Sequence, residues 1–301
     1  MGRRGRRQRG GWTGAVAVLL ACLGTFPPVA SGAAVRKTTA PATTAPAPIA
    51  ASYGPSPYQT VEVYPSATMG SPIVVLIHGG GWASSPGASY QVSEALALQR
   101  AGVTVVVANY DTYARVTGAF PTEVDDVVDA ARWSVAHAGD WGADGTDLEL
   151  LGGSAGGQLV ALAADRLDAD TPGTVRSVVT LSGALDMVAL VQDANAHTVS
   201  GYIGLHLREA LGCPSYAVPC TTAMAEPWSP AQQVTAATCP GNSLIINDTQ
   251  ELMPLDQPAS MVSALDAAGC PVTEILQPGR KHSFNGWSSV SARVTAFLLT
   301  N

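Results

Sequence analysis

A serine surrounded by glycines is the first residue whose setting suggests chemistry. Ser154 lies in the stretch G-G-S-A-G-G at residues 152–157, directly after a strand-like run and directly before a helix-like one. A sharp turn between strand and helix can hold a serine hydroxyl above a sheet, where it is free to act as a nucleophile. A glycine-rich turn without chemistry is the alternative, but the flanking strand and helix patterns favour the nucleophile.

A second glycine run could stabilise the negative charge that such a reaction creates. The stretch H-G-G-G-W at residues 78–82 follows a strand-like run that ends at Ile77. Glycines let backbone N–H groups point into a pocket, where they can meet the oxyanion that forms when an acyl carbon becomes tetrahedral. We expect the N–H groups of Gly80, Gly81 and Ala155 to form this oxyanion hole, and His78 to be structural. A phosphate-binding loop is the alternative, but no G-x-x-x-x-G-K pattern follows.

A nucleophilic serine also needs a base, and the chain has five histidines. His282 stands in a loop between the last predicted strand and the last predicted helix, which places it at the same sheet edge as Ser154. His137 falls within a helix pattern. His197 and His206 fall in a segment without strands, where we expect surface or lid residues. His282 is therefore the predicted base.

The elements that must position these residues alternate along the chain from residue 52 onward. The runs 72–77 and 103–108 are rich in β-branched residues without polar alternation, as in strands buried on both faces of a parallel sheet. Further strands are predicted at 148–151, 175–181, 243–247 and 272–276, with helices at 89–101, 122–138, 155–165, 258–268 and 288–299. This series predicts an α/β fold: a doubly wound, mostly parallel sheet of about eight strands in one domain.

One segment, residues 184–240, interrupts the alternation of strands and helices. It contains glycines, prolines and two cysteines but no clear strand pattern. Long insertions in doubly wound sheets lie at the carboxyl ends of the strands, where ligands bind. We expect this segment to form a small lid over the site.

The motifs together resemble those of the α/β-hydrolase superfamily, specifically esterases of the hormone-sensitive-lipase and BD-FAE (feruloyl-esterase-like) groups. The resemblance covers nearly all of residues 53–301. Its motifs are H-G-G-G-W at 78–82, N-Y at 109–110, F-P-x-x-x-D-D at 120–126, G-G-S-A-G-G at 152–157, S-P at 229–230, P-L-D-Q at 254–257 and G-x-x-H at 279–282. It implies an α/β-hydrolase fold and a Ser-His-acid triad that needs no metal and no organic cofactor. The chain departs from the family at Asp111, where relatives commonly have an arginine.

The acid of the triad is where the sequence is least conventional. In the family it lies in the loop after the seventh strand, but segment 244–254 is one residue shorter here than the usual pattern. Counting back from Pro254 puts Gln250 at the acid position, whereas counting forward from the strand puts Glu251 there. An amide cannot stabilise the imidazolium that forms during the reaction, so Glu251 is the predicted acid. Asp248 and a degraded triad that rests on Gln250 remain alternatives.

Four cysteines outside the N-terminal segment predict two disulfide bonds. Cys213 and Cys220 enclose a short loop with two prolines, which favours a bond between them. Cys239 and Cys270 each precede one of two strands that we expect to lie side by side, which favours the second bond. A metal site is the rival interpretation, but the chain has no Cys-x-x-Cys pair with ligand spacing.

The N-terminus has the three parts of a secretory signal peptide. Five arginines in the first ten residues precede an apolar run at 15–26 and a small-residue stretch at 29–33. We therefore expect a signal peptide at 1–33, an Ala/Pro/Thr-rich linker at 34–50 and the hydrolase domain at 51–301. A lipid anchor at Cys22, in the stretch L-L-A-C, and a retained membrane anchor are the alternatives, although the apolar run is short for a bilayer.

Charge and composition limit the classes of partner that the protein can bind. The chain is 47% hydrophobic and 13% charged with a formal net charge of −7, and removal of the N-terminal arginines would lower that charge by another five units. An acidic surface excludes nucleic acid and anionic membranes as partners of the mature domain. We expect a secreted or cell-envelope-associated serine hydrolase, a monomer or weak oligomer, that cleaves carboxylic esters of small or aromatic acyl groups. An amidase or peptidase with the same triad, and a non-catalytic surface binding module that has lost the acid, are the alternatives.

Overall fold

The computed structural model describes residues 45–84, 91–114, 120–213 and 217–300. All of these residues belong to one compact unit, Thr43–Asn301. The predicted signal peptide at 1–33, with Cys22, and most of the predicted linker lie outside the described residues. No helix within the described ranges is long and apolar enough to cross a membrane.

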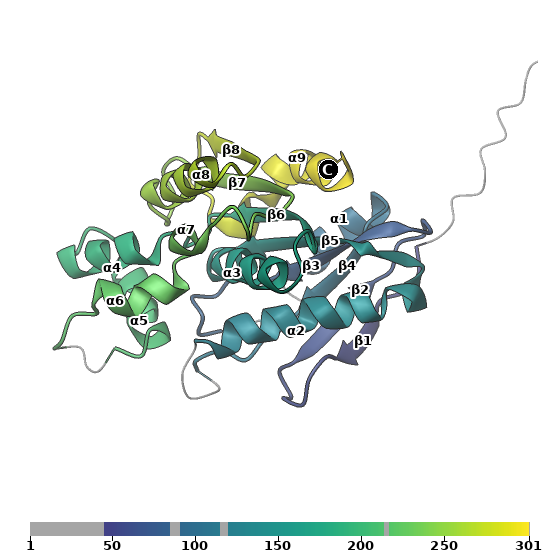
Figure 1. Cartoon of the computed structure of the whole chain (residues 1–301), viewed down its shortest axis with the longest axis horizontal. Helices are drawn as coiled ribbons and strands as arrows, with labels where there is room; N and C mark the ends of the chain where they lie inside the picture. The colour runs from purple at the N-terminus through teal and green to yellow at the C-terminus, as the bar shows by residue number, and fades with distance from the viewer. Residues whose placement is uncertain (1–44, 85–90, 115–119, 214–216, 301) are drawn as a thin grey trace, which may run out of the picture. The chain divides into compact units, whose positions relative to one another are not determined.

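A single eight-stranded sheet forms the centre of this unit (Figure 1), as the sequence predicted. Its strands are β1 (Ile49–Ser52), β2 (Thr60–Tyr64), β3 (Ser71–Ile77), β4 (Thr104–Ala108), β5 (Ala143–Gly153), β6 (Val175–Leu181), β7 (Asn242–Asp248) and β8 (Val272–Gln277). They lie in the order β1-β2-β4-β3-β5-β6-β7-β8. The strands β1 and β2 pair antiparallel at one edge, and all pairs from β4–β3 to β7–β8 are parallel.

Helices cover both faces of the sheet. They are α1 (Val92–Arg100), α2 (Thr122–Ala136), α3 (Ala155–Asp170), α4 (Met187–Ala196), α5 (Gly201–Ala210), α6 (Thr222–Ala225), α7 (Pro230–Gln233), α8 (Asp256–Ala268) and α9 (Trp287–Thr300), with short 3-10 helices at Ala138–Trp141, Glu226–Trp228 and Ser283–Gly286. The helices α1 and α9 pack on one face, and α2 and α3 pack on the other (Figure 1). Alternate residues of β3 enter the two cores, Ile73 on the α2/α3 side and Val74 on the α1/α9 side. Burial on both faces explains why this strand has no polar alternation.

The N-terminal edge of the sheet corrects the predicted linker. Strand β1 begins at Ile49, so the last two residues of the tract assigned to the linker form part of the sheet. Ile49 pairs with Val63, and Ala50 pairs with Glu62. Edge pairing uses the backbone, which a short Ala-rich segment supplies as well as any other, so composition gave no sign of this strand.

Strand β5 is also longer than predicted. The sequence indicated residues 148–151, whereas the strand runs over Ala143–Gly153 and its first residue pairs with Ser71 of β3. The first five residues of β5 are polar or small and only partly buried or exposed, so they have no hydrophobic pattern. The extension places Gly153 at the carboxyl end of the strand, immediately before Ser154.

The insertion at 184–240 contains helices α4 to α7 and no strand among its described residues. Asn195 donates a hydrogen bond to the Cys220 carbonyl, and Arg208 donates to the Val218 carbonyl. A disulfide bond joins Cys213 to Cys220, as predicted. These contacts organise the outer loop of the insertion around helices α4 and α5.

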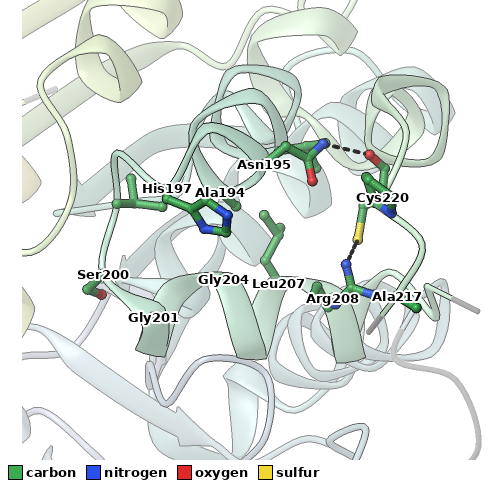
Figure 2. Close-up of a pocket in the computed structure, with 13 residues that line it drawn as sticks. Ala194, Asn195, His197, Ser200, Gly201, Gly204, Leu207, Arg208, Ala217 and Cys220 are labelled. Carbon is green, nitrogen blue, oxygen red and sulfur yellow. Dashed lines mark hydrogen bonds between the residues drawn. The ribbon is translucent and has the colours of Figure 1, made fainter. Parts of the chain in front are cut away.

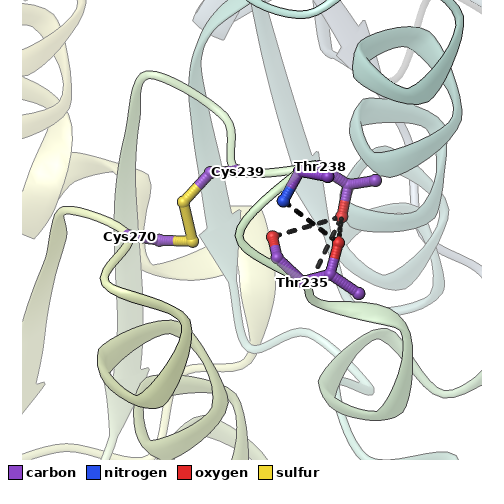
Figure 3. The surroundings of a disulfide bond; sticks show 5 residues. Thr235, Thr238, Cys239 and Cys270 are labelled. Carbon is purple, nitrogen blue, oxygen red and sulfur yellow. Dashed lines mark hydrogen bonds between the residues drawn. A yellow bond between two sulfur atoms is a disulfide. The ribbon is translucent and has the colours of Figure 1, made fainter.

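The second predicted disulfide bond is also present and links Cys239 to Cys270, with a Cα–Cα distance of 5.5 Å (Figure 3). The two cysteines lie just before β7 and β8, which are neighbouring parallel strands. The Ser243 N–H donates to the Pro271 carbonyl at 2.9 Å, so the segments leading into the strands also meet through the backbone. Strand adjacency therefore determines this pairing, as expected from the sequence.

Candidate active site

Ser154 occupies a strained turn between β5 and α3. Its backbone angles are φ 56° and ψ −124°, in a region that side-chain-bearing residues rarely adopt. The turn is held because the Ser154 N–H donates to the Leu181 carbonyl of β6 at 2.9 Å. On the helix side, a Cβ atom at Gly156 would lie 2.4 Å from the His78 carbonyl oxygen, so only glycine allows α3 to start this close to β3. The local sequence thus fixes both the strain and the close packing of the turn.

The glycine run after β3 forms a loop beside this turn. Gly81 and Trp82 both have left-handed backbone conformations, with φ 61° and 60°. Within the described part of the chain, no acceptor takes a hydrogen bond from the N–H groups of Gly80, Gly81 or Ala155. Unpaired N–H groups next to the serine match what an oxyanion hole requires.

His78, at the start of the glycine loop, helps to hold the conformation of this loop. The side chain is fully buried, its Nδ1–H donates to the Gly79 carbonyl at 2.7 Å, and its ring stacks on Tyr110 with centroids 4.4 Å apart. The Tyr110 hydroxyl donates to the His78 carbonyl at 3.0 Å. Burial lowers the pKa of His78 to about 4, so the ring is neutral at neutral pH. These contacts agree with the structural role expected from the sequence.

A buried amide links the loop, the helix after the serine and the insertion. The Trp82 indole N–H donates to Oε1 of Gln158 at 3.0 Å, and the Gln158 amide donates to the Trp228 carbonyl at 2.9 Å. The Trp228 ring stacks on Phe120, with centroids 5.0 Å apart. Gln158 was not singled out from the sequence, although its place one turn after Ser154 on a buried helix face could have indicated it.

The structure brings Glu251, not its neighbours, to the imidazole of His282. The His282 Nδ1–H donates to Oε2 of Glu251 at 2.5 Å, and the Glu251 side chain is completely shielded from solvent. The Asn247 amide donates to Oε1 at 2.9 Å, and the Met253 N–H donates to Oε2 at 3.1 Å. The hydrogen bonds from Asn247 and Met253 fix the Glu251 carboxylate, and the carboxylate in turn fixes the orientation of the His282 ring.

The two other candidates for the acid have different partners. Asp248 accepts hydrogen bonds from the Gln277 amide at 2.6 Å and from the Lys281 N–H at 2.8 Å, so it holds the loop that leads to His282. Gln250 is exposed and accepts from the Arg280 guanidinium at 3.2 Å. Neither Asp248 nor Gln250 has a hydrogen bond to His282 in the described structure. The count forward from the strand, which gave Glu251, therefore agrees with this arrangement, and the count back from Pro254, which gave Gln250, does not.

Ser154 and His282 line one cavity of about 480 Å³. The cavity is also lined by Gly79, Gly80, Gly81, Ser84, Tyr202, Leu252, Ser283, Phe284 and Asn285. No hydrogen bond joins Ser154 to His282 among the described contacts, and such catalytic contacts often shorten only when substrate binds. The predicted serine, histidine and oxyanion loop therefore share a single space, with Glu251 behind the histidine.

Three further residues of this region were not predicted. Asn247 orients Glu251, and the Ser182 hydroxyl accepts from the Ser283 N–H at 2.9 Å, which anchors the residue next to His282. Both lie at or just beyond the carboxyl end of a strand, which is the only sequence signal that could have found them. Tyr202 reaches the cavity from the insertion, and no local pattern indicated it.

The departure from the family at Asp111 has a local compensation. The Asp111 side chain accepts from the Ser56 hydroxyl at 2.8 Å, and its backbone N–H donates to Asp126 at 2.8 Å. Burial raises the pKa of Asp126 to about 6. Hydrogen bonds, rather than an ion pair with an arginine at this position, therefore hold this corner next to β4.

A second cavity, of about 500 Å³, lies within the insertion between α4, α5 and the Cys213–Cys220 loop (Figure 2). His197 and Arg208 are among its lining residues, and Arg208 points toward the sulfur of Cys220. None of the predicted site residues lines it. Among the described residues, no group of three or more His, Cys, Asp or Glu side chains could hold a metal ion.

Comparison with known proteins agrees with this fold. The model of a family described as "alpha/beta hydrolase fold" matches residues 74–286, and the chain belongs to this family. The chain is 27% identical over 223 residues to an ethyl acetate hydrolase of Pseudomonas putida, which covers 72% of this chain and 67% of that protein. Among solved structures, it is similar to a truncated carbohydrate esterase from gut microbiota (TM-score 0.70, 18% identity, 85% of this chain and 96% of that one). It is also similar to esterase B of Lactobacillus rhamnosis (TM-score 0.65, 20% identity, 82% and 83%).

Proposed function

We propose that this protein hydrolyses carboxylic esters with Ser154 as nucleophile, His282 as general base and Glu251 as the acid that orients the imidazole. The observation that carries the proposal is the hydrogen bond from His282 to the shielded carboxylate of Glu251, together with the cavity that His282 shares with Ser154. The similarity to an ethyl acetate hydrolase supports esters as the substrate class.

The reaction follows from the positions of these groups. Ser154 Oγ bonds to the acyl carbon while its proton passes to Nε2 of His282, and the alcohol leaves with that proton. A water molecule then repeats the sequence and releases the acid. Glu251 stabilises the imidazolium that exists between the two transfers, and the N–H groups of Gly80, Gly81 and Ala155 stabilise the oxyanion. No step calls for a metal ion or an organic cofactor.

The substrate is a neutral ester with a small or aromatic acyl group. None of the described residues that line the cavity is an aspartate, glutamate, lysine or arginine, so nothing there would compensate a charged substituent. The volume of about 480 Å³ lies in the lower half of the range for small-molecule sites.

Export from the cell completes the proposal. Two disulfide bonds suit an oxidising compartment, and the N-terminal sequence has the features of a signal peptide. The folded unit that begins with β1 at Ile49 would then be the secreted or envelope-associated enzyme, and the insertion at 184–240 would cover its site.

A fluorophosphonate probe tests the nucleophile directly. The wild-type protein should be labelled at Ser154, and Ser154→Ala should lose both labelling and ester turnover while circular dichroism and melting temperature stay unchanged. Substitution of the solvent-exposed Ser52 by alanine is the matched control and should keep both. A Ser154→Ala variant with wild-type turnover would sink the proposal.

The two alternatives are addressed by the same preparation. Matched p-nitrophenyl esters and p-nitroanilides of graded acyl length separate an esterase from an amidase, and we expect turnover of the esters only. The binding-module alternative rested on Gln250 as a replacement for the acid, and Gln250 contacts Arg280 instead. No other observation favours that alternative.

A further inference from the structure

Helix α5 of the insertion brings an aromatic ring into the cavity of Ser154 and His282. Tyr202, near the start of this helix, lines the cavity and is 53% exposed. A large ring that is half open to solvent beside the reacting groups offers apolar surface that a ligand can cover. Leu252 and Phe284 line the same cavity, so the apolar surface continues beyond the tyrosine.

The ring of Tyr202 is held in place by a second side chain of the same helix. His206, four residues later, meets it edge-on, with centroids 4.3 Å apart and planes 65° apart. Nδ1 of His206 and the Tyr113 hydroxyl share a hydrogen bond of 2.7 Å. Tyr202 therefore packs against a side chain that is itself held by a hydrogen bond. Little conformational entropy of the Tyr202 side chain is lost when a ligand packs on its exposed face.

His206 also contacts the predicted oxyanion loop. A Cβ atom at Gly81 would lie 3.0 Å from Cγ of His206, so the imidazole packs directly against the Gly81 backbone. The Tyr113 N–H donates to the Trp82 carbonyl at 3.1 Å, which ties the hydrogen-bond partner of His206 to the same loop. Helix α5 and the loop at 79–82 are thus joined through one histidine.

We propose that Tyr202 is the specificity-determining residue of this site and that a flat aromatic group of the ester packs against its ring. His206 is then a positioning residue that holds both the Tyr202 ring and the Gly81 backbone. The inference rests on the proposed ester hydrolysis and names its substrate class as neutral esters with an aromatic ring in the acyl or the alcohol part. The lack of charged groups among the described lining residues and the exposed ring of Tyr202 favour such a group over a charged or strongly polar one.

The test compares esters with and without a ring on purified full-length mature protein. The probes are ethyl cinnamate, phenyl acetate and ethyl acetate, and the measured quantity is the ratio of kcat/KM for a ring-bearing ester to that for ethyl acetate. Tyr202→Ala should lower this ratio at least tenfold for one of the ring-bearing esters, mainly through KM, and Tyr202→Phe should restore it. Leu205→Ala is the matched control, because Leu205 lies on the same helix, is 42% exposed and does not line the cavity.

The positioning role of His206 has a different signature. His206→Ala and Tyr113→Phe should each lower kcat about tenfold for all three esters, because the change reaches Gly81, and the double variant should lose little more than either single one. Unchanged ratios in Tyr202→Ala would overturn the specificity role, and additive losses in the double variant would overturn the coupling. Fluorophosphonate labelling of each preparation keeps the two proposals apart: an unlabelled wild type contradicts the ester hydrolysis itself, whereas labelled variants with unchanged ratios contradict only the role of Tyr202.

Discussion

The carboxyl edge of the sheet and the insertion at 184–240 contribute to one cavity but are built in different ways. At the sheet edge, Ser154, Glu251 and His282 follow strands β5, β7 and β8, whose register fixes where each loop begins. In the insertion, short helices are held by one disulfide bond and by side-chain-to-backbone hydrogen bonds such as that from Asn195 to Cys220.

This difference separates the residues that carry out the reaction from the residues that select the substrate. Parallel strands with a fixed register position catalytic groups within tight limits, as proton transfer requires. Helices packed over the edge can change in sequence without moving the strands, so they can alter which substrate fits. We therefore expect loss of a catalytic group at the sheet edge to cost most of the turnover. Changes in the insertion, apart from His206 where it packs against Gly81, should alter substrate preference or local stability.

The largest effect should come from the acid at the sheet edge. Glu251→Gln should lower kcat by about 10³ to 10⁴-fold, because an amide cannot stabilise the imidazolium of His282. Asp248→Asn should cost on the order of tenfold by loosening the loop before His282. Gln250→Ala, at the exposed neighbour, should stay within a factor of about two.

Steady-state kinetics on a p-nitrophenyl ester, with melting temperatures as a check on folding, measures all three variants. A crippled Gln250→Ala beside an active Glu251→Gln would show that the contact of Glu251 with His282 has no catalytic meaning.

The two disulfide bonds, one at the sheet and one in the insertion, should differ in how much they stabilise the protein. In the chain-entropy description, closing the loop between Cys239 and Cys270, 31 residues apart, stabilises the fold by roughly 4 kcal/mol. Closing the loop between Cys213 and Cys220, seven residues apart, contributes roughly 2 kcal/mol. Denaturant unfolding of the paired serine variants gives both values.

We expect the Cys239→Ser/Cys270→Ser variant to lose more stability than the Cys213→Ser/Cys220→Ser variant, since it frees two neighbouring strands of the sheet. The reverse order would mean that the insertion, and not the sheet, limits unfolding.

A smaller effect concerns the contribution of one residue of the sheet, Glu149, to the pH dependence of stability. Burial, reinforced by the nearby Asp147 carboxylate, raises the pKa of Glu149 on β5 to about 9. The folded protein then holds a proton that the unfolded chain releases near its ordinary pKa, so stability falls as pH rises from about 4.5 to about 9. The slope for one such proton is at most about 1.4 kcal/mol per pH unit.

Glu149→Gln should flatten this part of the stability curve and raise stability at pH 8 relative to pH 5. Glu226→Gln, at an exposed site of the insertion, is the control and should leave the slope unchanged. Chemical denaturation at several pH values would contradict the assignment if both variants kept the wild-type slope.

Much of the fold could be predicted because its signals are local. Continuous β-branched runs such as that of β3 mark strands buried on both faces, and the glycine pattern around Ser154 marks a turn that few other residues could form. The edge strand β1 was missed because its pairing uses only backbone groups. The first half of β5 was missed because its residues are polar or small and only partly buried or exposed.

The sequence by itself determined the α/β fold, the turn that carries Ser154, the glycine loop and the Cys213–Cys220 bond, because each depends on residue types at short or regular spacing. The Cys239–Cys270 bond followed from the predicted adjacency of two strands. Only the tertiary structure decided that Glu251 contacts His282 and that Gln250 does not. Gln250 and Glu251 are neighbours in one loop, yet only Glu251 meets the imidazole, and no periodicity in the sequence encodes which of the two side chains does so. The same holds for His206, which contacts Tyr202 on its own helix and Gly81 far away in the chain. These segments meet only when the insertion folds over the sheet.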